Sequence, residues 1–553
     1  MRLLTFEKYA LKRLLTVSLP FLAFAAAIFF INPIGEFPLF DDWSFARTVL
    51  NYQETGKLKI CGWASMTLVL QTWWGILWTK LFGFSFTVLR FSTIFCAFAS
   101  VVMLYKILSH QHKDYKMVSF FCLILIFNPI FFLCSLSFMT DIPFLLLMIF
   151  SSAYFYSFLS TQKSGEYIAA ILLCIGALLI RQLAVIVPVS FCAAWLFKKG
   201  FSIKNLPIAL LPLLIILLSL KIYAAWYHST QDQNNLYGLR ESDLLLELKS
   251  NLPGLLFKTI VSSFTYIFYA GLFLLPAIAA FILKIKDNKP YLKCFIWISI
   301  FLSLTILTVN FFINSRYPFE NVISILSSNG PGLYIIFDGE SYLQSNSHIY
   351  KWILRFFIII GAAGTSGLLI AFYHYIKQYF SDQYRRPEMI FIMVLLISNL
   401  ILISTSNRFD RYLLTILPPL LFLIYKCLPH AHSETNRNIT FKIIILIIPL
   451  IIYTTGGTSH YFAWNRARWQ GLYWLLNERG VLPENIDGGF EFNGWYCFDS
   501  EYEAVKEKNW YWVKNNSHAI AFNQDERYTI EKPLPYFNML KFRTDSLFVL
   551  KKN

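Results

Sequence analysis

Long apolar runs recur along the whole of this chain, and they limit its fold more than any other feature of the sequence. Two examples are LLTVSLPFLAFAAAIFFI at 14–31 and IIILIIPLIIY at 443–453. Runs of about 20 apolar residues cross a bilayer as helices, because a helix satisfies its backbone hydrogen bonds internally. Hydrophobic residues make up 56% of the 553 positions, whereas soluble proteins have about 45 to 50%. The sequence therefore predicts a polytopic α-helical membrane protein.

The apolar pattern predicts thirteen membrane-spanning helices. They lie near 14–33, 84–108, 117–135, 142–160, 167–182, 183–197, 205–223, 259–283, 292–312, 352–376, 388–404, 412–426 and 442–457. Residues 60–83 are also apolar enough to span, but tryptophan, which favours the membrane interface, occurs there four times, at Trp63, Trp73, Trp74 and Trp78. We interpret this segment as an interfacial or re-entrant pair of short helices, because the loops that then face the cytoplasm carry more Lys and Arg.

Basic residues indicate the orientation. The first apolar run follows four of them, Arg2, Lys8, Lys12 and Arg13, which predicts a cytoplasmic N-terminus. Thirteen spans then place the C-terminus on the outer side. We attribute the net charge of +16 to basic residues in cytoplasmic loops and to contact with anionic lipid, and not to a surface that binds nucleic acid.

The chain from about residue 458 onward has the composition of a soluble domain. A helix is expected over 463–479. Strand patterns follow at 488–496, 518–523 and 546–552. We therefore predict two domains: a transmembrane module over 1–457, with a first outer loop at 34–83, and a small α/β extracytoplasmic domain over 458–553.

An acidic pair, Asp41 and Asp42, follows the first apolar run in FPLFDDWSFARTV. Two carboxyl groups so close together raise the pKa of one member, which can then act as a general base. The alternative is a structural role, because Asp is a favoured N-cap and an amphipathic helix begins at Trp43. The residues alone leave both interpretations open.

A third acid, Asp141, lies in SFMTDIPFLLL, in a very short outer connection between two apolar helices. A carboxylate so close to the hydrocarbon is costly unless it is paired or functional. Thr140 or Asp141 could instead cap the next helix, with Pro143 in its first turn, and both roles can hold at once.

Three arginines are predicted on the same outer side: Arg181 in LLIRQLAVIVP, and Arg408 and Arg411 in SNRFDRYLLTILPP. Basic residues are disfavoured in short outer loops, so their presence requires a reason. A guanidinium can bind phosphate through two parallel hydrogen bonds and remains charged near lipid. The alternative is an ion pair of Arg408 or Arg411 with Asp410. The convergence of three carboxylates and three guanidiniums on one face is stronger evidence for a site than any single motif.

These motifs resemble those of the GT-C superfamily of membrane glycosyltransferases, in particular the family 39 type that includes protein O-mannosyltransferases and the lipid A aminoarabinose transferase. The matching residues are FDDW after the first helix, MTDIP at Asp141, RQ at 181–182, and RY followed by LPP within 411–419. The resemblance implies inverting transfer of one sugar from a polyprenyl-phosphate carrier, on the periplasmic face of a bacterial inner (plasma) membrane. The extended signatures and the trefoil domain of the protein O-mannosyltransferases are missing, so a protein is not the first acceptor we expect.

The resemblance also implies roles for the acids. Asp41 or Asp42 would deprotonate the acceptor hydroxyl, and Asp141 would orient the acceptor or the base. The sequence contains no Gly-rich phosphate loop or dinucleotide fingerprint, so no cofactor is certain. The three Asp could bind a divalent cation, Mg²⁺ or Mn²⁺, or act without one.

The basic residues have their own implied role in this family. Arg181, Arg408 and Arg411 would hold the lipid phosphate and stabilise the charge that develops on it. Gln182 and Tyr412 would be hydrogen-bonding neighbours.

Two other functions are alternatives to the glycosyltransferase. A transporter or flippase for lipid-linked sugars also needs many helices and buried charges, but such proteins usually have charges within their helices and repeated halves. A structural subunit with a degenerate site would be expected to lose the acidic pair, which is present here. We therefore predict a glycosyltransferase that acts, within the lipid bilayer, on a glycolipid, polysaccharide or protein acceptor.

Overall fold

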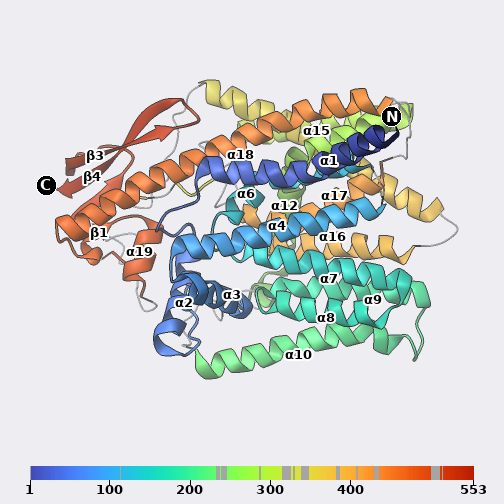
Figure 1. Cartoon of the computed structure of the whole chain (residues 1–553), viewed down its shortest axis with the longest axis horizontal. Helices are drawn as coiled ribbons and strands as arrows, with labels where there is room; N and C mark the ends of the chain where they lie inside the picture. Colours follow the sequence, from blue (N-terminus) through green and yellow to red (C-terminus); the bar gives the residue numbers. More distant parts are fainter. Residues whose placement is uncertain are drawn as a thin grey trace.

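The computed structural model describes residues 2–111, 114–231, 237, 246–285, 288–313, 326–327, 330–334, 336–337, 348–381, 386–405, 409–428, 435–499, 511–513 and 515–553. Long helices lie side by side in a bundle, and a small β-sheet lies at one end of it (Figure 1). The N-terminus lies at the opposite end. We call these the sheet end and the N-terminal end of the bundle.

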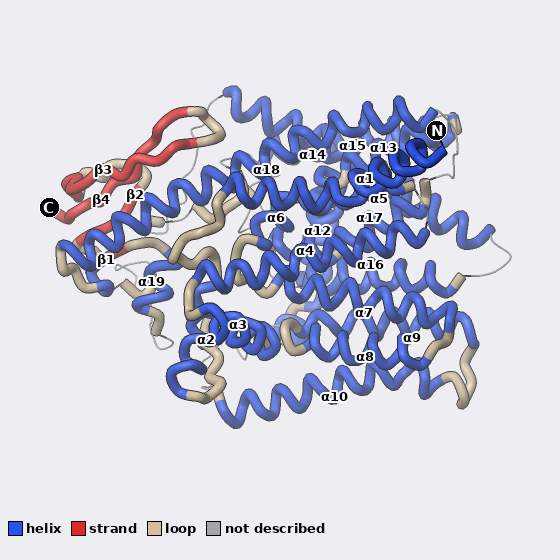
Figure 2. Tube along the Cα trace, in the orientation of Figure 1, coloured by secondary structure: helices blue, strands red, loops and turns tan. Residues whose placement is uncertain are grey.

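Helices account for most of the described residues (Figure 2). Those from the first half of the chain are α1 (Arg2–Ile31), α2 (Asp42–Thr55), α3 (Val69–Phe82), α4 (Phe86–Gln111), α5 (Tyr115–Ile126), α6 (Pro129–Ser135), α7 (Asp141–Thr161), α8 (Ser164–Leu178), η1 (Gln182–Val185), α9 (Ile186–Lys199), α10 (Leu206–Thr230) and α12 (Leu252–Phe273). Those from the second half are α13 (Leu275–Ile285), α14 (Lys289–Ile313), α15 (His348–Ser381), α16 (Pro387–Thr405), η2 (Asp410–Thr415), α17 (Leu417–Lys426), α18 (Thr435–Tyr473), η3 (Trp474–Glu478), η4 (Pro483–Asn485) and α19 (Phe490–Cys497).

Ten of the described helices are long and apolar enough to cross a membrane. The pair of α5 and α6, bent by 69°, makes an eleventh if it is one span. Each of these lies on a predicted span, which confirms the polytopic α-helical membrane fold. The other two predicted spans, 167–182 and 412–426, contain the shorter helices α8 and α17, of 15 and 10 residues. At a rise of 1.5 Å per residue these helices are about 22 Å and about 15 Å long, shorter than a hydrocarbon core of about 30 Å.

Residues 60–83, all of which are described, contain only one helix, α3, and its 14 residues are too few to span. α3 lies beside α2 near the sheet end of the bundle (Figure 1). The pair of short helices predicted within 60–83 is therefore wrong, because this segment forms one short helix that follows an irregular stretch.

Helix α18 connects the bundle to the sheet without interruption (Figure 1). Its 39 residues join the span predicted at 442–457 to the helix predicted at 463–479. The change of composition near residue 458 therefore lies inside one helix.

The sheet contains four strands in the order β1-β2-β4-β3. They are β1 (Ile486–Asp487), β2 (His518–Ala521), β3 (Tyr528–Asn538) and β4 (Arg543–Lys552); β1 pairs with β2 in parallel, and the other pairs are antiparallel. β2 and β4 confirm the strands predicted at 518–523 and 546–552. β3 was not predicted from the sequence because it contains Pro533 and Pro535, and a strand tolerates proline mainly at a sheet edge, where β3 lies.

The strand predicted at 488–496 is wrong, because Phe490–Cys497 form helix α19. Side chains at the end of β1 turn the chain: Asp487 Oδ1 accepts hydrogen bonds from Gly489 N at 3.2 Å and from Asn493 Nδ2 at 3.0 Å. Asn493 Oδ1 accepts from Gly488 N at 3.0 Å. These local bonds outweigh the strand preference of the aromatic residues.

A buried ion pair joins the C-terminal region to the loop after α1. Both terminal nitrogens of Arg468 in α18 donate to Oε2 of Glu491 in α19 at 3.0 Å, and the two side chains are 0% and 1% exposed. Arg468 Nε donates to Gly488 O at 2.7 Å. The second carboxylate oxygen of Glu491 accepts from Phe40 N at 3.3 Å. The C-terminal region thereby fixes the backbone next to Asp41.

We predict that Arg468→Met lowers the free energy of unfolding by about 3 to 5 kcal/mol, because it leaves the Glu491 carboxylate buried without a counter-charge. The matched control is Arg479→Met. Arg479 pairs with Glu531 but is 47% exposed, so its loss is expected to cost about 1 kcal/mol or less. Thermal unfolding in detergent measures both, and equal losses would contradict a special role for the buried pair.

Candidate active site

The acidic pair lies at the sheet end, where the loop after α1 enters α2. Arg90 of α4, 1% exposed, holds this loop: its Nη2 donates to Phe37 O at 2.9 Å, and its Nη1 donates to the carbonyl oxygens of Pro33 and Gly35. Phe40 has a φ of 58°, a left-handed conformation that a bulky residue rarely adopts. The loop is therefore held in one strained shape immediately before the acids.

Asp42 is buried, with 2% exposure, and both of its carboxylate oxygens accept backbone hydrogen bonds. Oδ1 accepts from Leu39 N at 2.6 Å and Oδ2 from Phe138 N at 3.0 Å. Burial raises the pKa of Asp42 to about 7, although Arg90 and the two backbone bonds oppose this rise. Asp42 thus links the loop after α1 to the connection between α6 and α7.

Asp41 occupies the N-cap position of α2 but makes no side-chain cap bond. Its Oδ1 accepts from Trp63 Nε1 at 2.9 Å, and its Oδ2 accepts from Arg411 Nη1 at 2.8 Å. The Asp41 side chain is 23% exposed. The two members of the acidic pair therefore differ: Asp42 is enclosed by backbone, and Asp41 faces side chains and remains accessible.

Arg411, in η2, is the buried partner of Asp41, with a side chain that is 5% exposed. Burial lowers the pKa of Arg411, but the carboxylates of Asp41 and Asp141 outweigh it and raise the pKa above its ordinary value. Its Nε has no hydrogen-bond partner among the described residues. The sequence offered an ion pair of Arg411 with Asp410 as an alternative, but the carboxylate that pairs with Arg411 is Asp41. One oxygen of Asp410 accepts from Leu326 N at 2.6 Å.

A second buried ion pair joins Asp141, the first residue of α7, to Arg181, which precedes η1. Arg181 Nη1 donates to Asp141 Oδ1 at 2.5 Å, and the side chains are 9% and 3% exposed. Asp141 Oδ2 has no hydrogen-bond partner within the part of the chain that is described. Thr140 is the N-cap residue of α7 and makes no side-chain cap bond.

Tyr412 lies between the two ion pairs. The guanidinium carbon of Arg181 is 4.9 Å from its ring centroid, and that of Arg411 is 5.9 Å away. We call these five residues, Asp41, Arg411, Tyr412, Arg181 and Asp141, the charged array. Buried polar atoms without partners are uncommon in folded proteins, so the unpaired atoms of Arg411 and Asp141 indicate a place for a polar ligand.

The other predicted residues have different outcomes. Gln182 begins η1 beside Arg181 and is half-buried. Arg408 lies outside the described residues. Trp63 was not predicted as a partner of Asp41, because a tryptophan-rich segment indicates an interface belt first. The only signal was the nearness of this segment to the acidic pair.

A divalent cation at this site remains a prediction. Among the described residues, no three His, Cys, Asp or Glu side chains lie together as a metal site. Asp41 and Asp141 each contact an arginine. Any ion would therefore have to share these carboxylates with the guanidiniums.

Comparison with known proteins gives a family for part of the chain. Residues 69–226 match the family model described as Dolichyl-phosphate-mannose-protein mannosyltransferase. Over these residues, the match agrees with the resemblance to family 39 glycosyltransferases. The matched region runs from α3 to α10 and contains Asp141, Arg181 and Gln182. No curated protein matches the sequence.

Two solved structures align with most of this chain. ArnT from Cupriavidus metallidurans, bound to undecaprenyl phosphate, is 13% identical, with 87% of this chain and 75% of that chain covered and a TM-score of 0.41. The archaeal oligosaccharyltransferase AglB from Archaeoglobus fulgidus, in complex with an inhibitory peptide and a dolichol-phosphate, is 15% identical. The alignment with AglB covers 85% of this chain and 58% of that chain, with a TM-score of 0.43.

We predict that Arg181→Leu lowers stability by about 3 to 5 kcal/mol, because it leaves the buried Asp141 carboxylate without its counter-charge. The double variant Arg181→Leu with Asp141→Asn is expected to recover much of this loss, since the uncompensated charge is then removed. The thermal midpoints of the single and double variants measure the recovery. A double variant no more stable than the single one would contradict the argument.

The raised pKa of Asp42 predicts a pH dependence of stability. Between its ordinary pKa of 3.8 and about 7, the unfolded state ionises this carboxyl while the folded state keeps it protonated. Its contribution to stability therefore falls as the pH rises through this interval and is constant above it. As the pH rises through this interval, we expect the thermal midpoint to fall less in Asp42→Asn than in the wild type. Parallel curves of thermal midpoint against pH for the two proteins would refute the prediction.

Proposed function

We propose that this chain is an inverting glycosyltransferase that moves a sugar from a polyprenyl-phosphate carrier to an acceptor hydroxyl at the sheet end of the bundle. The charged array carries the proposal, because it combines an accessible carboxylate with two buried guanidiniums at the end of a membrane-spanning bundle. The family-model match over residues 69–226 supports a glycosyltransferase.

The two arginines of the array suit the phosphate of the donor. The guanidinium carbons of Arg181 and Arg411 lie 4.9 and 5.9 Å from the Tyr412 ring centroid, and the proposed phosphate site lies beside them. The Arg411 Nε hydrogen without a described partner can donate to a phosphate oxygen. Buried guanidiniums also stabilise the negative charge that develops on the phosphate as the sugar leaves.

Asp41 is the proposed general base, because it is the exposed member of the acidic pair. The proton of the acceptor hydroxyl passes to the Asp41 carboxylate as the acceptor oxygen bonds to the anomeric carbon. The bond from that carbon to the phosphate oxygen breaks, and its electron pair leaves with the polyprenyl phosphate. Attack from the side opposite the leaving group inverts the anomeric configuration.

The ion pair between Asp41 and Arg411 couples donor binding to the base. Without donor, Arg411 pairs with the Asp41 carboxylate. A phosphate that engages Arg411 competes for this guanidinium, so that Asp41 can accept the proton of the acceptor. The hydrogen bond from Trp63 keeps the carboxylate in position during this exchange. Asp42 and Asp141 are positioning residues in this scheme, with Asp42 holding the loop and Asp141 orienting Arg181.

The same proposal extends to location and acceptor. A cytoplasmic N-terminus would place the sheet end on the periplasmic face of a bacterial inner membrane, since the N-terminus and the sheet lie at opposite ends of the bundle (Figure 1). The acceptor would be a glycolipid, a polysaccharide or a protein that presents a hydroxyl group there.

Transfer from radiolabelled polyprenyl-phosphate sugars in membranes tests the reaction. We expect Asp41→Asn to lower the transfer rate by about 10² to 10⁴, the contribution of a positioned general base, while donor binding is retained. Asp525→Asn, in the connection between β2 and β3, is the control and is expected to transfer at the wild-type rate.

Two results would overturn the proposal. Normal transfer by Asp41→Asn at normal abundance would exclude Asp41 as the base. Movement of the lipid-linked sugar across the membrane without cleavage from its carrier would favour a transporter or flippase, which could use the same charged array.

A further inference from the structure

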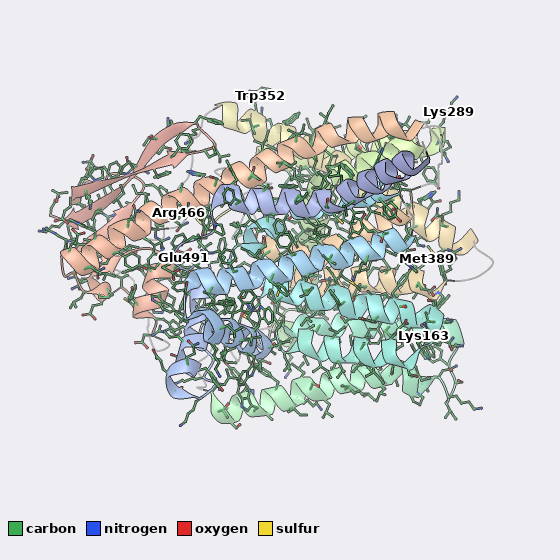
Figure 3. The ribbon with its side chains drawn as sticks, in the orientation of Figure 1. Lys163, Lys289, Trp352, Met389, Arg466 and Glu491 are labelled. Carbon is green, nitrogen blue, oxygen red and sulfur yellow. The ribbon has the colours of Figure 1, made fainter. Side chains whose placement is uncertain are left out.

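A cavity of about 390 Å³ lies between α4, α7, α16 and α17. Pockets that hold small ligands enclose about 300 to 1,000 Å³. Its position is at the N-terminal end of the bundle: Figure 3 labels Met389 of α16 and Lys163 after α7 at that end, and Glu491 at the sheet end. The cavity is therefore separate from the charged array.

The lining of the cavity changes from apolar to polar along the helices. On α4 the order is Met103, Leu104, Lys106, Ile107, His110 and Gln111, and on α7 the lining begins at Met148 and ends at Thr161. Since both helices run toward the N-terminal end, the apolar residues lie deep and the polar ones lie at the mouth. This gradient suits a ligand with a buried apolar chain and a polar head at the mouth.

Charges near the mouth favour an anionic head. Lys106 and His110 line the cavity and are exposed. Arg386 lies within electrostatic range of Tyr156, a lining residue, and of Lys426. Two acids also lie there: Glu388 acts on the same two residues, and Glu166 accepts a hydrogen bond from the lining residue Thr161 at 2.5 Å. Among the described residues, the basic side chains of Lys106, Arg386 and Lys426 outnumber these two acids.

We propose that this cavity binds one anionic phospholipid from the leaflet at the N-terminal end of the bundle. One acyl chain fills the apolar interior, and the phosphate lies near Lys106 and Arg386. The lining of α4, α7 and α16 belongs to membrane-spanning helices, so the lipids of that leaflet surround the mouth. The site is independent of the proposed transfer reaction.

The chain of a donor bound at the charged array is the competing occupant. Along α7, Met148 is seven residues beyond Asp141, a distance of about 10 Å, so a chain from the array could reach the cavity. Such a chain would enter from the apolar end and leave the basic mouth without an anion. The charge at the mouth therefore favours the phospholipid.

Photo-reactive phosphatidylglycerol and phosphatidylcholine, in vesicles that contain the purified full-length protein, test the proposal. We expect phosphatidylglycerol to label α7 or α16, and phosphatidylcholine to label them weakly. Lys106→Gln is expected to lower the labelling by about fivefold, the effect of one basic residue on binding to an anionic membrane lipid. Ala153→Phe, which fills the cavity, should abolish the labelling.

Lys80→Gln in α3 is the control, because this lysine is also exposed but lies outside the cavity lining. It is expected to label as the wild type does, and unchanged gel-filtration behaviour checks that each variant is folded. Equal labelling by the two lipids, or wild-type labelling of Ala153→Phe, would overturn the proposal. A third result would also overturn the proposal: polyprenyl phosphate competes with the labelling, and Arg411→Leu abolishes this competition. The cavity would then hold the chain of the donor.

Discussion

A single buried ion pair, between Arg468 and Glu491, holds the sheet end of this molecule together. A charge taken out of water is costly unless an opposite charge and further hydrogen bonds compensate it. Here the pair also bonds to the carbonyl oxygen of Gly488 and to the backbone N–H of Phe40, which lies 451 positions from Glu491 in the sequence. Phe40 can keep its left-handed conformation because this bond holds Phe40 itself and the bonds of Arg90 hold the residues before it. The different surroundings of Asp41 and Asp42 follow from that shape.

The charged array is built where helices are interrupted. Arg181 lies between α8 and η1, Arg411 lies in η2 before α17, and Asp141 begins α7. An uninterrupted apolar helix offers no place for such charges within hydrocarbon. Each interruption turns a charged side chain toward the others at the sheet end. α8 and α17, which flank two of these interruptions, are both too short to span.

The positions of the apolar helices could be predicted from the sequence, because the hydrophobicity of a segment depends on its composition alone. The sequence also placed the acids and arginines on one face, since each follows or precedes an apolar run. It could not show that Asp41 pairs with Arg411 while Asp42 binds backbone, because those contacts join segments far apart in the chain. The helix at 490–497 was missed for a related reason: aromatic residues favour a strand, and the bonds of Asp487 and Asn493 that override them are visible only in three dimensions.

Helix α18 gives the bundle and the sheet a common rotational register. Each residue of an α-helix turns the chain by about 100°, so an insertion or deletion of one residue near the middle of α18 would swing the whole sheet around the helix axis. Arg468 and Glu491 would then face away from the loop after α1. Homologous chains with this architecture must conserve the length of this connection, or change it by whole turns, while the loops elsewhere remain free to vary.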